Sequence, residues 1–282
     1  MRVLLTGHNG YIGTVLAPLL ERAGHQVVGL DTGYFEGCTL GEAPERIPAM
    51  RKDLRDLEVD DLRGFEAVVH LAALSNDPLG DLDERLTYDI NHHATVRLAR
   101  LAKAAGVRRF LLSSSCSTYG AASSDAVLDE RAAFNPVTAY GVSKVRSEHD
   151  LAALADASFS PTYLCSATAY GFSPQLRVDL VVSSLTGYAL LTGEVLIKSD
   201  GTPWRPLVHV EDIAGAFLAV LQARLDTVHD QAFNVGQNHE NFQVRADKHF
   251  KRGIWPDRVL PAGSPSRNGR PTHARKGSRR RT

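Results

Sequence analysis

The chain has 282 residues, 43% of them apolar and 23% charged, and its 32 basic side chains balance 32 acidic ones. This length suits one full α/β domain with a small appended lobe. No apolar run approaches the roughly 20 residues that span a bilayer, so we expect no membrane partner, and nucleic acid is not an expected partner either.

The first elements of the chain follow the order strand, glycine turn, helix. Val3-Leu-Leu5 predicts a buried strand, and the apolar spacing of residues 15–20 predicts the helix. Between them, Gly7 permits a tight turn, Gly10 lets the backbone approach a pyrophosphate, and Gly13 allows close packing of helix on strand. The helix N-terminus would face the anion. This order predicts a dinucleotide phosphate site.

A second strand, Gln26-Val-Val-Gly-Leu30, ends at Asp31, 18 residues after Gly13. An acidic side chain at this place can accept hydrogen bonds from the adenosine ribose. It would repel the 2′-phosphate of NADP, and no arginine or lysine follows before Arg46. Asp31 therefore predicts NAD as the cofactor.

Strands and helices alternate to about residue 165, which predicts an α/β fold with a doubly wound, mostly parallel sheet of the Rossmann type and a small, incomplete C-terminal substrate lobe. We expect strands near 2–6, 26–30, 47–50, 67–71, 110–114 and 161–167, and helices near 12–23, 83–105 and 138–155. The dinucleotide-binding domain would span 1–164 and include 206–236, the substrate lobe would span 165–205 and 237–254, and a basic tail would span 255–282.

Tyr140 and Lys144 stand four residues apart, after the serine-rich strand end Ser113-Ser-Ser115. Residues with this spacing share a helix face. The ammonium would therefore favour the ionised phenol and move its pKa of about 10 towards neutrality. Such a tyrosinate can take a proton from a substrate hydroxyl. The pair predicts a proton-transfer site if its context is that of a dinucleotide enzyme.

Taken in order, these features resemble the extended short-chain dehydrogenases/reductases, the family of nucleotide-sugar epimerases and dehydratases. The matches run through most of residues 1 to 237 and comprise the glycine turn, Asp31, Lys52-Asp-Leu54, Val68-Val-His-Leu-Ala-Ala73, Asn91, Phe110-Leu-Leu-Ser-Ser-Ser115 and Tyr140 with Lys144. The resemblance implies a catalytic triad of Ser115, Tyr140 and Lys144. It implies NAD contacts from Gly7, Gly10, Tyr11, Ile12, Gly13, Asp31, Asp53, Leu54, Leu71, Ala72, Ala73, Tyr140 and Lys144.

The same resemblance implies a nucleotide-sugar substrate bound by the lobe. The implied substrate contacts are Ser75, Cys116, Thr168, Asp179, Leu180 and Arg205. Arg205 is the candidate diphosphate clamp because a guanidinium offers a fork of donors; the alternative is a surface arginine in a turn. The family often has asparagine at 168 and arginine at 165, so the nucleotide contacts of Thr168 and Cys165 are expected to differ.

The reaction type depends on Cys116-Ser117. Sugar 4,6-dehydratases of the family have Asp-Glu directly after the catalytic serine or threonine, where the carboxylates move protons at neighbouring carbons. Their replacement favours 4-epimerisation by transient oxidation at a hydroxyl carbon. A 4-ketoreductase, another dehydratase of the family and a non-catalytic dinucleotide-binding protein remain alternatives. Cys116 itself is either an acid/base or a small structural residue, and we favour the structural role.

Residues 245–282 hold 12 Lys and Arg against 2 Asp. They form either a disordered basic arm or a truncated or frame-altered terminus that has lost part of the sugar pocket. The abrupt break inside a family-like segment favours the second account, and in both we expect mobility beyond about residue 255.

The chain begins directly with a strand pattern, so we expect no signal or transit peptide. Its three cysteines show no paired spacing, which favours the reducing cytoplasm and no metal site. His92 and His93 point about 100° apart on a helix and are not expected to share a metal. The family often pairs through helices corresponding to 83–105 and 138–155, so a homodimer is an alternative to ordinary core packing there.

Overall fold

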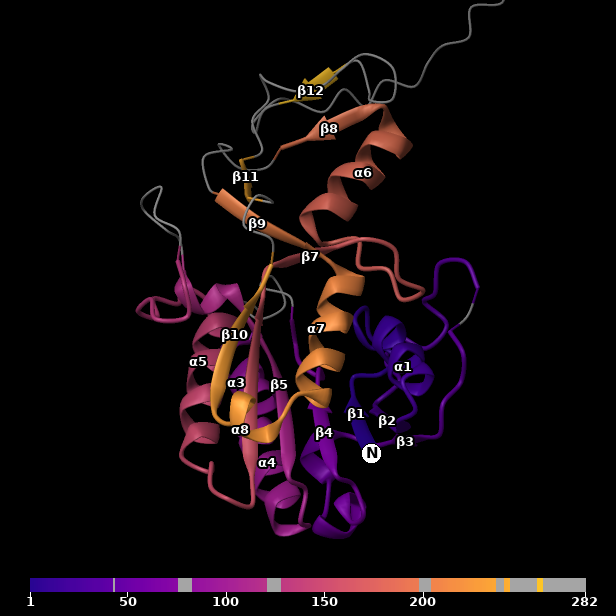
Figure 1. Ribbon diagram of the computed structural model, residues 1–282. Helices are drawn as coiled ribbons and strands as arrows, with labels where there is room; N and C mark the ends of the chain where they lie inside the picture. Colours follow the sequence, from indigo (N-terminus) through magenta and orange to yellow (C-terminus); the bar gives the residue numbers. More distant parts are fainter. Residues whose placement is uncertain are drawn as a thin grey trace, which may run out of the picture.

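The computed structural model describes residues 1–42, 44–75, 83–120, 128–197, 204–236, 241–243 and 258–260. Within these residues one parallel sheet of seven strands runs in the order β10-β6-β5-β4-β1-β2-β3 (Figure 1). Its strands are β1 (Arg2–Thr6), β2 (Gln26–Asp31), β3 (Ala49–Arg51), β4 (Ala67–His70), β5 (Arg109–Ser115), β6 (Ser160–Ser166) and β10 (Gln231–Val235). The predicted doubly wound parallel sheet is confirmed.

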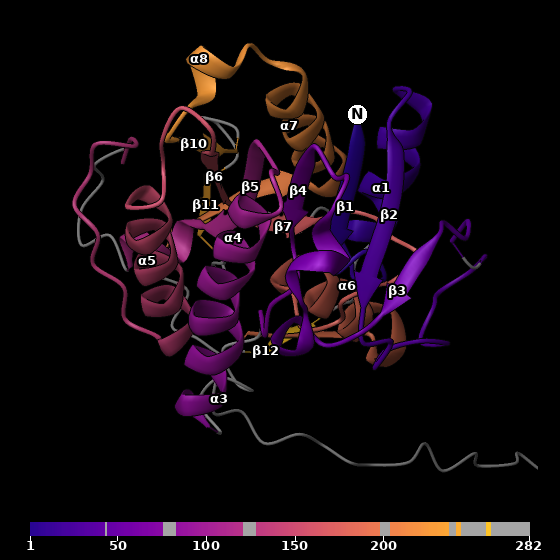
Figure 2. The same cartoon turned by 90° about the horizontal axis from the view of Figure 1, so that it is seen from below.

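Helices cover both faces of the sheet, because a parallel sheet must bury both (Figure 2). One face carries α1 (Gly13–Arg22) and α7 (Val210–Gln222), and the other carries α4 (Ala94–Ala104) and α5 (Ala139–Ala152). Alternate strand residues go to opposite cores: Val3 and Leu5 pack towards α1, whereas Leu4 packs towards α4. All three are completely buried. The N-terminal strand thus contributes to the core on both faces of the sheet.

The predicted helix 83–105 is not continuous. It consists of α3 (Glu84–Tyr88), a π turn η3 (Asp89–His93), and α4. The cause lies at Asn91, whose buried side chain accepts from Leu74 N at 2.8 Å and donates to Leu74 O at 2.9 Å, while its own carbonyl accepts from Ser147 Oγ. A π turn inserts one residue into the helical repeat, which lets this amide turn inward.

Several segments after β6, among them β7, α6, β8 and β9, lie above the carboxyl ends of the strands (Figure 1). A three-stranded sheet contains β7 (Thr168–Tyr170), β9 (Trp204–His209) and β11 (Asn241–Gln243), and β8 (Glu194–Leu196) pairs with β12 (Arg258–Leu260). The remaining elements are the helices α6 (Val181–Thr192) and α8 (Leu225–Val228) and the short 3₁₀ turns η1 (Leu54–Asp56), η2 (Val59–Leu62) and η4 (Cys116–Tyr119).

Two predictions about these segments stay predictions. The chain returns to the main sheet at β10, which pairs with β6, but the proposed domain bounds are not otherwise tested. The predicted mobility beyond residue 255 falls, apart from 258–260, outside the described residues. None of the helices in the described part of the chain combines the length and apolarity needed to cross a membrane.

Candidate active site

The glycine turn between β1 and α1 is folded so tightly that it has no room for side chains. Gly7 has a φ of +72°, and a Cβ atom there would lie 2.8 Å from Ala72 N. At Gly13 a Cβ atom would lie 2.3 Å from Gly7 O, the same oxygen that accepts from Gly10 N at 3.0 Å. No described side chain caps the first turn of α1. Thr14 N and Val15 N of this turn donate to Gly10 O and Ile12 O, so an anion would approach the bare backbone that precedes them.

Asp31 stands at the end of β2 and is held against the glycine turn. Its carboxylate oxygens accept from the backbone nitrogens of Asn9, at 3.2 Å, and Gly33, at 2.8 Å. The imidazole of His8 packs on Gly29, where a Cβ atom would lie 2.5 Å from the ring. The carboxylate thus has a fixed place beside the turn, as a ribose contact requires.

The segment that follows β4 packs against the glycine turn, and a buried histidine joins it to β1. His70 Nδ1 lies 2.7 Å from Thr6 Oγ1, and His70 Nε2 lies 2.8 Å from Thr95 Oγ1. Thr6 Oγ1 also accepts from Ala72 N at 3.3 Å. Burial, and then the charge of Lys144, lower the pKa of His70 to about 3. A neutral His70 therefore fixes the segment that contains Ala72.

Tyr140 and Lys144 lie on the first turns of α5, which begins where Thr138 Oγ1 accepts from Gly141 N at 3.1 Å. Lys144 Nζ lies 5.6 Å from the centre of the Tyr140 ring and donates to Ser113 O at 2.7 Å. Lys144 is only 3% exposed. Burial lowers its pKa to about 8, against the raising effect of the Glu148 carboxylate. The helix spacing therefore places the ammonium beside the phenol ring.

Ser115 ends β5 and starts the short turn η4. Its Oγ accepts from Ser117 N and contacts Ser117 Oγ, both at 3.1 Å. A Cβ atom on Gly141 would lie 2.8 Å from Ser117 O, so η4 touches the residue that follows Tyr140. Cys116 is largely enclosed, and burial raises the pKa of its thiol while the charge of Arg205 lowers it. The neutral thiol and the exposed guanidinium thus stand within electrostatic range of each other.

The substrate-lobe segment after β7 is attached directly to the glycine turn. Tyr11 Oη donates to Gly171 O at 2.8 Å, and Ser173 Oγ lies 2.8 Å from both Tyr11 O and Thr14 Oγ1. Burial raises the pKa of Tyr11 to about 12. The hydroxyl of Tyr11 therefore joins the cofactor and substrate segments as a neutral donor.

Comparison with known proteins decides the family. The model of the NAD dependent epimerase/dehydratase family matches residues 3–236. The chain belongs to this family. It is 30% identical over 249 residues to the UDP-glucose 4-epimerase of Mycolicibacterium smegmatis, and this alignment covers 85% of this chain and 78% of the relative. It is 29% identical over 289 residues to that of Corynebacterium glutamicum, covering 96% and 85%.

Solved structures agree with this assignment. MoeE5 in complex with UDP-glucuronic acid and NAD superposes with a TM-score of 0.76 at 32% identity and covers 86% of this chain and 79% of that one. TunA, an NAD-dependent NDP-hexosamine 5,6-dehydratase, superposes with a TM-score of 0.75 at 26% identity, covering 86% and 77%. The predicted family, its enzymatic character and its NAD dependence are confirmed.

The residues present fit NAD. A Cβ atom on Gly7 or Gly13 would collide with the backbone of Ala72 or of the turn itself, so only glycine permits this close turn, and the Asp31 carboxylate is bonded beside it. Leu71, Ala72 and Ala73 follow β4 and are half-buried, as is Ile12. Their individual contacts with NAD stay predictions.

Sequence reasoning missed Arg177, which joins two predicted substrate residues. Its Nη1 donates to Ser75 Oγ at 2.7 Å, its Nη2 donates to Ser75 O at 3.0 Å, and its Nε donates to Asp179 Oδ1 at 3.1 Å. The loop after β4 and the entry to α6 are thus held together by one guanidinium. The sequence signal was an arginine two residues before the predicted Asp179.

The other predicted residues are distributed more widely. Asp53 caps η1 and pairs with Arg55, which lowers the pKa of Asp53; Leu54 is buried. Thr168 begins β7, Leu180 precedes α6, and Arg205 is exposed on β9. Among the described residues no side-chain hydrogen bond joins these three to one another, so their shared role in substrate binding stays a prediction.

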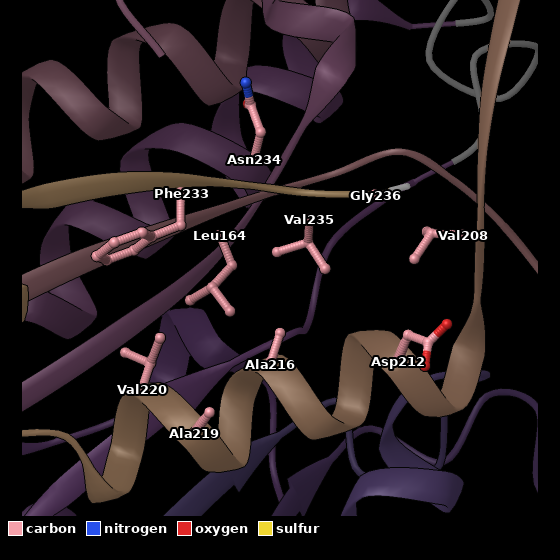
Figure 3. Close-up of a pocket in the computed structure, with 10 residues that line it drawn as sticks. All are labelled: Leu164, Val208, Asp212, Ala216, Ala219, Val220, Phe233, Asn234, Val235 and Gly236. Carbon is pink, nitrogen blue, oxygen red and sulfur yellow. The ribbon is translucent and has the colours of Figure 1, made fainter. Parts of the chain in front are cut away.

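Two further features lie outside this arrangement. His92 Nε2 lies 2.7 Å from Asp150 Oδ2, and no group of three metal-ligating side chains occurs among the described residues. An apolar pocket of about 400 Å³ lies between α7 and the strands β6 and β10, lined by Leu164, Val208, Asp212, Ala216, Ala219, Val220, Phe233, Asn234, Val235 and Gly236 (Figure 3). It contains none of the predicted site residues.

Proposed function

We propose that the protein is an NAD-dependent epimerase of a nucleotide sugar that works by transient oxidation at a hydroxyl carbon. The observation that carries this proposal is the fully buried Lys144, held on Ser113 O beside the ring of Tyr140. A buried ammonium next to a phenol favours the ionised phenol, which is the form that removes a hydroxyl proton.

Each catalytic residue has a defined task. NAD, when bound, accepts a hydride from the sugar carbon and returns it to the opposite face. Tyr140 takes the hydroxyl proton as the carbon is oxidised and gives it back to the carbonyl oxygen when the carbon is reduced. Ser115 hydrogen-bonds the reacting oxygen, and Lys144 stabilises the tyrosinate. Proton and hydride are both returned, so the product is an isomer of the substrate.

The relatives support a UDP-sugar as the substrate. Two are UDP-glucose 4-epimerases, and MoeE5 binds UDP-glucose as well as UDP-glucuronic acid. Cys116-Ser117 in place of Asp-Glu supports epimerisation over 4,6-dehydration. A different dehydration remains the second candidate, because TunA is a 5,6-dehydratase and the neutral thiol of Cys116 is available as a proton donor.

The test is to incubate the protein with NAD⁺ and, separately, UDP-glucose, UDP-glucuronic acid and UDP-N-acetylglucosamine, and to follow the sugar protons by NMR and the mass of the product. We expect a 4-epimer of unchanged mass from at least one substrate and none with Tyr140→Phe. Loss of the mass of water identifies a dehydratase, and a keto sugar formed together with NADH identifies a ketoreductase working in reverse. NAD binding without any turnover would contradict the enzymatic proposal.

A further inference from the structure

The three serines at the end of β5 make three different contacts. Ser113 O accepts from Lys144 Nζ, Ser114 Oγ donates to Glu148 Oε1, and Ser115 starts η4. Lys144 and Glu148 are one helical turn apart on α5, so they share the face that packs on β5. Two consecutive strand residues therefore bond to an ammonium and a carboxylate that lie on the same face of the helix.

Glu148 is only 6% exposed, which is unusual for an acidic side chain. A second donor, Cys165 Sγ on β6, lies 3.7 Å from the same carboxylate oxygen that accepts from Ser114. Burial is the largest effect and raises the pKa of Glu148 overall, while the bonds from Ser114 and Cys165 and the charge of Lys144 oppose this rise. Two neutral donors and one cation thus favour the ionised carboxylate in an enclosed place.

The other titratable groups near this pair contribute no second cation. On neighbouring elements, His70 of β4 is neutral and interacts with the charge of Lys144, while Tyr163 and Cys165 of β6 and Tyr119 of η4 interact with the charge of Glu148. Burial raises the pKa of each of these phenols and of the Cys165 thiol. Cys165 also interacts with Lys144, but burial keeps its thiol neutral, so the counter-charge for Lys144 among these groups is the Glu148 carboxylate.

A buried lysine without a counter-charge tends to lose its proton, because desolvation penalises the charged form. The carbonyl of Ser113 supplies a hydrogen bond but no net charge. We propose that Glu148 is a positioning residue for catalysis: its carboxylate keeps Lys144 protonated and held on Ser113 beside Tyr140. The role of Glu148 in turnover rests on the proposed function. Its effect on the protonation of Lys144 does not, and that protonation can be measured without a substrate.

The direct test is the pKa of Lys144, measured from its ¹³Cε and ¹⁵Nζ NMR signals in labelled protein and assigned by their loss in Lys144→Arg. Glu148→Gln keeps the shape and the acceptor for Ser114 but removes the charge. We expect the pKa of Lys144 to fall by about one unit or more. Asp150→Asn removes a more exposed carboxylate from the same helix and should leave the pKa of Lys144 unchanged. An unchanged pKa in Glu148→Gln overturns the proposal.

Ser114→Ala provides a second variant if Glu148→Gln does not fold. Ser114 Oγ holds the Glu148 carboxylate, so its loss frees the counter-charge from its place, and the pKa of Lys144 should again fall; no change would contradict the proposal. Once a substrate is known, the pH profile of kcat adds a test. Activity that needs protonated Lys144 is lost as pH rises through its pKa, so this loss should occur at lower pH in Glu148→Gln and return towards normal in Glu148→Asp. If Glu148 had only a structural role, the pH profile of kcat in Glu148→Gln would be the same as in the unaltered protein.

Discussion

The cofactor side and the substrate side of the molecule hold their polar groups in different ways. On the cofactor side, His70, Lys144 and Glu148 are almost fully buried, and each has hydrogen-bond partners on neighbouring strands or helices. On the substrate side, Arg205 is exposed, Arg177 pairs with a partly exposed Asp179, and no residue of α6 is buried among the described residues. The proposed catalytic groups therefore lie in the buried part of the fold, whereas the groups expected to contact the sugar are exposed to solvent.

This difference has an energetic consequence. Buried charges change pKa values and the stability of the fold strongly when a partner is lost. Exposed ion pairs such as Arg224 with Asp226 contribute little. Substitutions on the cofactor side should therefore affect catalysis, pH dependence and folding together, whereas those on the substrate side should mainly affect substrate choice.

The largest expected effect tests the catalytic group itself. Tyr140→Phe removes one oxygen and should lower turnover by at least about 10³-fold, within the range of general acid and base catalysis. NAD affinity, measured by calorimetry, should change only a few-fold because the cradle is untouched. Tyr188→Phe makes the same chemical change on the exposed face of α6 and should leave turnover unchanged. Near-normal turnover in Tyr140→Phe would show that another group is the base.

The second prediction tests whether a buried neutral histidine makes the fold sensitive to acid. Burial lowers the pKa of His70 to about 3 in the folded protein, compared with its ordinary value of 6.5. The unfolded chain therefore binds one more proton between these values, and stability present above pH 6.5 is lost as pH falls towards 3. One proton corresponds to about 1.4 kcal/mol per pH unit.

His70→Gln keeps polar atoms near Thr6 and Thr95 but does not titrate in this range. Chemical unfolding of both proteins at a series of pH values should show that the difference in unfolding free energy between them depends on pH in this interval. Two parallel curves would refute the assignment of a neutral, buried His70.

A pair of identical substitutions compares the two sides directly. Gly13→Ala puts a Cβ atom 2.3 Å from Gly7 O, and we expect a loss of about 1–3 kcal/mol of stability together with weaker NAD binding. Gly187→Ala, in the middle of α6, meets no atom within 4 Å and should gain about 0.5–1 kcal/mol from helix propensity. Thermal unfolding with and without NAD measures the stability and the NAD binding of both variants. Equal effects would mean that the cradle is less closely packed than the structure shows.

The smallest effect concerns cofactor choice. Asp31 is fixed by Asn9 and Gly33 at the ribose end of the cradle, and it should favour NAD over NADP by at least tenfold, or about 1.4 kcal/mol. Asp31→Asn removes the charge that repels a 2′-phosphate and should narrow the preference. Titration calorimetry measures the dissociation constants of NAD and NADP. Equal constants for the two cofactors in the unaltered protein would contradict the prediction.

Much of the cofactor side could be predicted from the sequence because its signals are local. The glycine turn, the apolar strand of residues 3–5 and the spacing of Tyr140 and Lys144 each depend on residues close in the chain. The strand and helix positions predicted from them lie near the observed ones. The interruption of the helix at Asn91 could not be predicted, because its cause is an amide bonded to Leu74 on another segment.

The sequence by itself determined the order of the elements, the glycine cradle and the four-residue spacing of the catalytic pair, since short-range geometry is sufficient for each. The tertiary structure decided which groups meet across the chain: Glu148 with Ser114 and Cys165, and Arg177 with Ser75. The physical reason is that burial and counter-charges come from neighbours on different strands, and only the packed sheet determines how much water each of these groups retains.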